Sequence, residues 1–150
     1  MTARVALIDT NVLVYAHDAG DRAKQRKALQ VLERLASTGG GVLSSQCLVE
    51  FVRAVTKHAS FRLTFLNAAL LVEHYSAAYQ VYPVTPGTVT DACHAAAAFP
   101  VSLWDALIWA VARANRVPVI LTEDLQHRPD IEGIRYLNPF APDFDLGVLG

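Results

Sequence analysis

The segment from Val5 to Ala16 constrains the fold more than any other part of the chain. Four apolar residues are followed by Asp9, Thr10 and Asn11, and an apolar run resumes directly afterwards. A short, unbroken apolar run is typical of a strand buried on both faces of a parallel sheet, and the second run predicts a helix. Asp9 would then lie at the carboxyl end of the strand, where open α/β sheets bind their ligands.

The rest of the chain repeats this alternation of short apolar runs and amphipathic segments. The patterns predict strands at 5–8, 42–45, 81–85, 117–121 and 134–137, and helices at 12–16, 22–36, 46–58, 65–79, 88–99 and 103–115. Strands that alternate with helices predict a three-layer α/β/α sandwich with a mainly parallel sheet of four to five strands. We expect one domain over 1–140 and a C-terminal tail over 141–150. Residues 138–150 contain two prolines, and we expect them to form an arm or to be disordered.

Composition points to a cytoplasmic protein with a partner. Hydrophobic residues make up 53% of the 150 residues and charged residues 18%, which suggests apolar surface left for a second copy of the chain. The apolar run at 63–72 is too short to span a membrane, and no early run has the length of a secretion signal. Cys47 and Cys93 lie in apolar helical patterns, so we expect buried thiols in a reducing compartment.

Charge is distributed unevenly along the chain. The formal net charge is −1, but residues 22–62 contain eight Lys or Arg residues against two Glu residues, a surplus of six positive charges. Such a region could bind the phosphate backbone of RNA without reading its sequence. It could equally be a solvated helix face.

Four carboxylates lie at strand ends or beside apolar residues, where an unpaired charge is disfavoured. They are Asp9, Glu50, Asp105 and Asp124. If a parallel fold brings them to one edge, they repel one another unless a divalent cation is shared between them. Oxygen ligands without a Cys or His cluster favour Mg²⁺ or Mn²⁺ over zinc.

Each carboxylate also has a local structural explanation. Asp9, Asp105 and Asp124 could each cap a helix or a turn, and Glu50 could pair with Arg53 on its own helix. The shared-cation hypothesis accounts for all four at once. It also gives a role to three neutral side chains that could orient carboxylates or water around the ion, namely Asn11, Ser102 and Thr122.

Four segments resemble the motifs of PIN-domain nucleases. They are Leu7–Tyr15, Glu50 in a helix after the second strand, Ser102–Ile108 and Leu121–Asp124. At this size the chain is most similar to the VapC-type toxin of a bacterial toxin–antitoxin pair. The resemblance implies a metal-dependent endoribonuclease that forms a homodimer and is inhibited by a cognate antitoxin.

The resemblance also implies roles for the acids. Asp9, Glu50, Asp105 and Asp124 become the catalytic and metal-binding residues, with Asp9 and Asp105 in direct contact with the ion. Because Glu123 immediately precedes Asp124, either could point inward, and we favour Asp124. In this mechanism one or two ions bind the scissile phosphate, activate water and neutralise charge on the leaving oxygen.

Several side chains near the motifs have two interpretations. His17 could contact substrate or be packed against its neighbours. Tyr15, Trp104 and Trp109 could stack on RNA bases, but both tryptophans lie in an apolar helix and are expected in the core or a dimer interface.

Two other functions compete with RNA hydrolysis. A phosphatase with Asp9 as nucleophile commonly has a second acid two residues later, and this chain has Asn11 there and no lysine after Lys57. A non-catalytic PIN-like module could use an acidic cleft to hold a basic peptide, although a complete set of four acids argues against lost catalysis.

Overall fold

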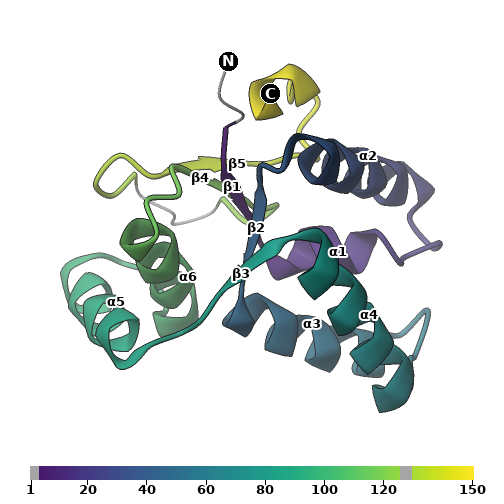
Figure 1. The fold of residues 1–150 in the computed structure, drawn as a ribbon, viewed down its shortest axis with the longest axis horizontal. Helices are drawn as coiled ribbons and strands as arrows, with labels where there is room; N and C mark the ends of the chain where they lie inside the picture. Colours follow the sequence, from purple (N-terminus) through teal and green to yellow (C-terminus); the bar gives the residue numbers. More distant parts are fainter. Residues whose placement is uncertain (1–3, 126–129) are drawn as a thin grey trace.

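Strand β1 (Ala6–Ile8) lies at the centre of a parallel sheet in the computed structural model, which describes residues 4–125 and 130–150. In this part of the chain the sheet has five strands in the order β3-β2-β1-β4-β5 (Figure 1). The other strands are β2 (Gly41–Ser44), β3 (Gln80–Tyr82), β4 (Val119–Leu121) and β5 (Arg135–Leu137). Ala6 pairs with Gly41 on one side and with Val119 on the other.

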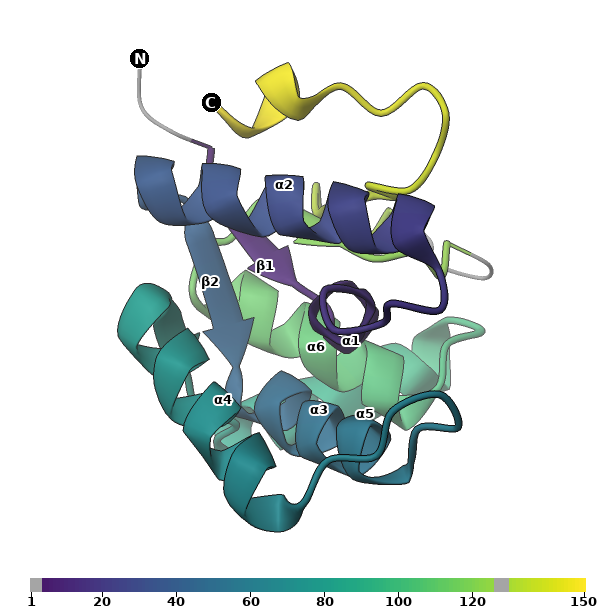
Figure 2. The same cartoon turned by 90° about the vertical axis from the view of Figure 1, so that its right-hand side faces the viewer.

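Helices cover both faces of the sheet. Successive residues of β1 point to opposite sides, and all three are apolar and buried. Ala6 and Ile8 belong to one core cluster, and Leu7 belongs to the other. The first face is covered by α1 (Thr10–Tyr15), α2 (Arg22–Thr38), α3 (Ser45–Lys57) and α4 (Phe65–Ala78), and the second by α5 (Pro86–Ala98) and α6 (Leu103–Ala114) (Figures 1 and 2). The predicted three-layer α/β/α architecture is therefore confirmed.

Hydroxyl side chains cap the amino termini of several of these helices. Thr64 and Ser102 cap α4 and α6, as local sequence predicts for Ser and Thr before an apolar run. The expected start of α5 at residue 88 is wrong by two residues, since a Thr85 and Thr88 capping box places Pro86 in the first turn. Proline is well suited to that position because the first helical N–H has no partner within the helix.

The C-terminal segment packs against the domain, and the expectation of an arm or disorder is wrong. Residues Leu146–Leu149 form a short 3₁₀ helix that contacts α2, and Leu149 is only 1% exposed. Within the described ranges, no helix is both long and apolar enough to cross a membrane. Cys47 is buried as expected, but Cys93 is exposed because the inward positions of α5 are Thr88, Ala92 and Ala95.

Candidate active site

A cleft of about 500 Å³ opens at the carboxyl ends of β1 and β4. The chain continues from β1 to β2 and β3 on one side and later returns to add β4 and β5 on the other. Such a reversal of strand order leaves a crevice at the sheet edge. The cleft is lined by Asp9, Thr10, Asn11, Val14, Tyr15, Asp18, Glu50, Ala54, His58, Asp105, Ile108 and Asp124. All four predicted acids therefore line one cleft.

Asp9 is the most buried of the four acids, at 5% exposed. Its Oδ1 accepts a hydrogen bond from the Thr10 backbone N–H at 2.7 Å, so it caps α1, and its Oδ2 accepts one from the Thr122 hydroxyl at 2.8 Å. These bonds offset part of the cost of burying the charge and fix the orientation of the carboxylate. Capping and a place in the cleft thus occur together.

Glu50 reaches the cleft from the middle of α3. Its two oxygens accept hydrogen bonds from Gln46 Nε2 at 3.0 Å and from the Thr10 hydroxyl at 3.2 Å. Among the ion pairs of residues 4–125 and 130–150, none joins Glu50 to Arg53, the partner that helical spacing offered. Glu50 is therefore held by neutral donors, which leave its negative charge in the cleft.

Asp105 and Asp124 complete the lining from the second half of the chain. Asp105 lies in the first turn of α6, where Ser102 accepts a hydrogen bond from its backbone N–H at 3.1 Å. Asp124 follows β4, and its N–H donates to the Thr122 hydroxyl at 3.2 Å. The side chain of Glu123 is outside the cleft lining and pairs with Lys24 at 2.7 Å. Of the two adjacent acids, Asp124 is thus the one that lines the cleft.

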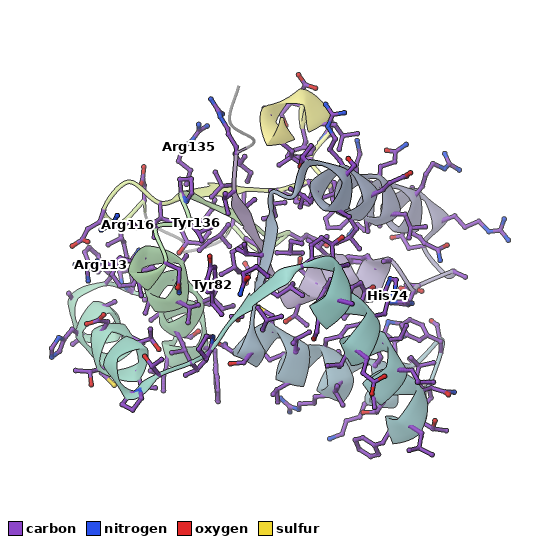
Figure 3. All side chains as sticks on the ribbon, viewed as in Figure 1. His74, Tyr82, Arg113, Arg116, Arg135 and Tyr136 are labelled. Carbon is purple, nitrogen blue, oxygen red and sulfur yellow. The ribbon has the colours of Figure 1, made fainter. Side chains whose placement is uncertain are left out.

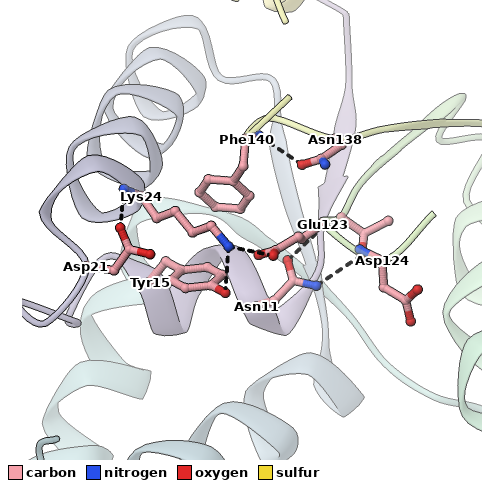
Figure 4. A network of polar contacts seen from close by, with 9 residues as sticks. Asn11, Tyr15, Asp21, Lys24, Glu123, Asp124, Asn138 and Phe140 are labelled. Carbon is pink, nitrogen blue, oxygen red and sulfur yellow. Dashed lines mark hydrogen bonds and ion pairs between the residues drawn. The ribbon is translucent and has the colours of Figure 1, made fainter. Parts of the chain in front are cut away.

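The neutral side chains expected to support the acids form a hydrogen-bonded chain between β1 and β4. Asn11 donates from Nδ2 to the Thr122 hydroxyl at 3.0 Å and accepts at Oδ1 from the Glu123 N–H at 3.2 Å (Figure 4). Thr122 in turn donates to Asp9. Ser102 acts differently, because it orients Asp105 only through the cap of α6.

Two further cleft residues were not predicted. His58 ends α3, and its Nε2 lies 3.6 Å from Asp18 Oδ2, while its ring stacks on Phe61 at 4.1 Å. Neither residue belongs to a recognisable spacing, because Asp18 is in a turn that only the fold brings to the end of α3.

The lining of the cleft does not include His17, Trp104 or Trp109. The Nε2 of His17 is hydrogen bonded to the Tyr75 hydroxyl at 2.7 Å, and burial lowers the pKa of this histidine, with a smaller contribution from His74. Trp109 is buried and donates from Nε1 to the Ile131 carbonyl at 3.2 Å, whereas Trp104 is 62% exposed. The expectation of a place in the core or a dimer interface is confirmed for Trp109, which is in the core, and a dimer interface stays a prediction for Trp104.

Basic residues of 22–62 lie in at least two places around the cleft. Arg53 and Lys57 line a hollow of about 510 Å³ that shares Glu50 with the cleft, while Lys24 is paired with Glu123. Arginines later in the chain, Arg113, Arg116 and Arg135, lie near the amino ends of β4 and β5, at the edge opposite the cleft (Figure 3).

The negative charge of the cleft affects its neighbours. Burial raises the pKa of the Cys47 thiol to about 12, and the charges of Asp9 and then Glu50 add to this effect. Both carboxylates therefore act on one buried group beneath the cleft, as expected for charges held in a poorly solvated region.

The donor set is suited to a hard divalent cation, although it is not a preformed cage. Within residues 4–125 and 130–150, no three His, Cys, Asp or Glu side chains lie close enough together to hold an ion as they stand. Magnesium commonly keeps several waters and contacts only one or two protein carboxylates, with substrate phosphate completing its shell. The four carboxylates of the lining supply oxygen ligands that fit an ion bound in that way.

Comparison with known families identifies the chain. A model of the PIN domain matches residues 6–128. The chain belongs to the PIN domain family. The likeness inferred from the four sequence segments is thereby confirmed, and the matched range contains all four acids of the cleft.

Solved structures share this fold. A toxin–antitoxin complex from Klebsiella pneumoniae has 20% identity and a TM-score of 0.66, with 89% of this chain and 97% of that chain covered. VapBC2 from Rickettsia felis, bound to a DNA fragment from its promoter, has 16% identity, a TM-score of 0.65 and coverages of 89% and 98%.

Mycobacterium tuberculosis VapC20, a sarcin–ricin loop cleaving toxin, has 20% identity, a TM-score of 0.59 and coverages of 77% and 86%. No curated protein is significantly similar to the chain in sequence.

Proposed function

We propose that this PIN domain is a metal-dependent endoribonuclease, the toxin component of a toxin–antitoxin module, which hydrolyses RNA phosphodiester bonds. The observation that carries the proposal is the convergence of Asp9, Glu50, Asp105 and Asp124 on one cleft from four separate segments of the chain. These four carboxylates come from parts of the chain that are far apart in sequence, and PIN domains are nuclease folds.

Asp9 and Asp105 are the carboxylates we assign to direct contact with Mg²⁺ or Mn²⁺. The hydrogen bonds that Asp9 accepts from the Thr10 backbone N–H and the Thr122 hydroxyl fix the orientation of its carboxylate. Glu50 and Asp124 would bind through water or through a second ion. Such an ion supplies a nucleophilic water near neutral pH and stabilises charge on the leaving oxygen.

The hollow beside the cleft supports an RNA substrate. Arg53 and Lys57 carry the positive charges needed to bind backbone phosphates, and the exposed ring of Trp104 offers a surface for a base. Because the hollow and the cleft meet at Glu50, a strand bound there would lead its next phosphate toward the acids. These contacts carry little sequence information, so they do not select one RNA.

We also propose two protein partners, a cognate antitoxin and a second copy of the chain, in the cytoplasm. The outer face of α4 exposes Phe65, Leu66 and Leu70, each more than half exposed, which is unusual for a monomer. Light scattering after size-exclusion chromatography should give the mass of a dimer, and a monomer at micromolar concentration would contradict this assignment.

Cleavage of structured RNA tests the nuclease directly. The protein is incubated with RNA in Mn²⁺, in EDTA, and as the Asp105→Asn and Asp143→Asn variants. Asp143 is an exposed acid outside the cleft and serves as the matched control. We expect cleavage in Mn²⁺ by the wild type and the control variant only. Cleavage that survives both EDTA and Asp105→Asn would overturn the metal mechanism.

The same preparation separates the alternatives. A phosphatase would form an acyl-phosphate on Asp9 that can be trapped, and a non-catalytic module would bind its partner tightly without cleaving any RNA pool in Mn²⁺. Asn11 occupies the position where such a phosphatase commonly has its second acid. Its amide is hydrogen bonded to Thr122 and to the backbone of Glu123, so it holds the loop after β4.

A further inference from the structure

Lys24 makes a long-range contact with the loop that carries Asp124. It lies in the first turn of α2, and its Nζ is 2.7 Å from Glu123 Oε1 and 3.2 Å from the Tyr15 hydroxyl oxygen (Figure 4). Tyr15 lines the cleft, but Lys24 and Glu123 do not. The ion pair therefore lies behind the wall of the cleft.

Aromatic rings fix the position of the ammonium group. Its nitrogen lies 4.7 Å from the centre of the Tyr15 ring and 5.9 Å from that of Phe140. Hydrogen bonding to Glu123, and then to Tyr15, raises the pKa of Lys24, so it stays charged throughout the physiological range. A cation held between two rings and a carboxylate has a much smaller choice of positions than a free surface lysine.

The ion pair with Lys24 restrains Glu123, the residue next to the cleft acid Asp124. Glu123 and Asp124 are adjacent, both carry a carboxylate, and the longer side chain of Glu123 has more rotatable bonds. The backbone N–H of Glu123 donates a hydrogen bond to Asn11 Oδ1, which restrains the backbone at this position. The side chain of Glu123 can still rotate unless it is also held. Without this restraint, the Glu123 carboxylate could turn into the cleft and bind the same divalent metal ion that we assign to Asp124.

We propose that Lys24 is a positioning residue that holds Glu123 outside the cleft, so that Asp124 and not Glu123 binds the divalent metal ion. The proposal rests on the proposed nuclease function and goes beyond it, because it assigns a role to a residue 99 positions away in sequence from the acid it restrains. It predicts that losing Lys24 is harmful only while Glu123 carries a charge.

Four variants test this logic. They are Lys24→Met, Lys24→Arg, Glu123→Gln and the double variant Lys24→Met/Glu123→Gln, with Arg34→Met as the control, an exposed cation about 15 Å further along α2. We expect Lys24→Met to lower kcat by about 10- to 100-fold, the range typical for residues that orient metal ligands. Mn²⁺ affinity, measured by electron paramagnetic resonance without RNA, should change in the same variant.

The double variant decides between explanations. If Lys24 acts by restraining a competing carboxylate, Glu123→Gln alone and the double variant should both stay within a fewfold of wild type, and Lys24→Arg should retain activity. A double variant as impaired as Lys24→Met would overturn the proposal, as would a large loss in Glu123→Gln. An increase in KM alone would assign Lys24 to RNA binding and would also overturn it.

A crystal structure of Lys24→Met separates this inference from the nuclease assignment. Glu123 should leave its present position and turn toward the cleft. If it stays, the positioning role is refuted whether or not the chain is a nuclease. If wild type neither binds Mn²⁺ nor cleaves RNA but Glu123 does turn, the nuclease proposal fails and the restraint stands.

Discussion

Replacing Thr122 by valine should show how much of the RNA cleavage depends on the orientation of the acids, because all four acids remain in this variant. The Thr122 hydroxyl is fully buried and makes three hydrogen bonds, donating to Asp9 Oδ2 and accepting from Asn11 Nδ2 and the Asp124 N–H. Valine has nearly the same shape but no hydroxyl. All four acids remain in Thr122→Val, yet the bonds that align two of them are lost.

The expected cost follows from these contacts. A hydrogen bond to a charged group contributes about 1.5–3 kcal/mol, and a buried donor left unpaired costs a further amount of similar size. Since valine recovers some apolar contact, we expect the free energy of unfolding to fall by about 2–4 kcal/mol. RNA cleavage in Mn²⁺ should fall by about 10- to 100-fold, mostly in kcat, because the ligands are misaligned and not removed.

Thr88→Val controls for loss of stability. Thr88 is also buried, and its hydroxyl donates to the Thr85 carbonyl at 2.9 Å in the cap of α5, away from the cleft. Denaturant titration and RNA cleavage are measured for both variants. Equal losses of cleavage in Thr122→Val and Thr88→Val would refute the reasoning, since activity would then follow stability alone.

Two further predictions concern the fold. Leu149→Ala should lower the free energy of unfolding by about 2–4 kcal/mol, because the residue is buried against α2; a loss below about 1 kcal/mol in denaturant titration would show that the segment packs weakly. Because burial lowers the pKa of His17 below its ordinary 6.5, the unfolded chain binds this proton more readily. Stability should therefore decrease as the pH falls through 6.5, and this decrease should be smaller in His17→Phe, as measured by unfolding at a series of pH values.

The central strands and several helix starts could be predicted because their causes are local. The run that ends at Ile8 is apolar without alternation, and it is buried on both faces of the sheet. Ser102 and Thr64 cap helices because their hydroxyls reach the backbone three residues ahead. The burial of Leu149 depends on α2, more than a hundred residues earlier, so no local pattern indicated it.

The same distinction applies to the site. Asp9 and Asp124 could be predicted to converge because strand ends in a parallel sheet share one edge, which depends only on fold class. Glu50 and Asp105 lie in α3 and α6, and the resemblance of their segments to PIN-domain motifs indicated them. The pairing of His58 with Asp18 and of Lys24 with Glu123 requires knowledge of how α2 and α3 pack, and no spacing predicts it. For this reason the sequence left open which of Glu123 and Asp124 points inward, whereas in the structure Glu123 pairs with Lys24 of α2 and Asp124 lines the cleft.

That choice gives a test of the cleft in which two adjacent residues are compared. A cation that binds only the folded protein stabilises it by about 2.7 kcal/mol at a concentration one hundred times its Kd. Asp124→Asn should reduce this Mn²⁺-dependent gain in the free energy of unfolding, since Asp124 lines the cleft. Glu123→Gln should leave the gain unchanged, although it breaks the pair with Lys24. Equal reductions in the two variants would mean that Mn²⁺ responds to the overall charge of the loop, and the assignment of Asp124 to the cation would fail.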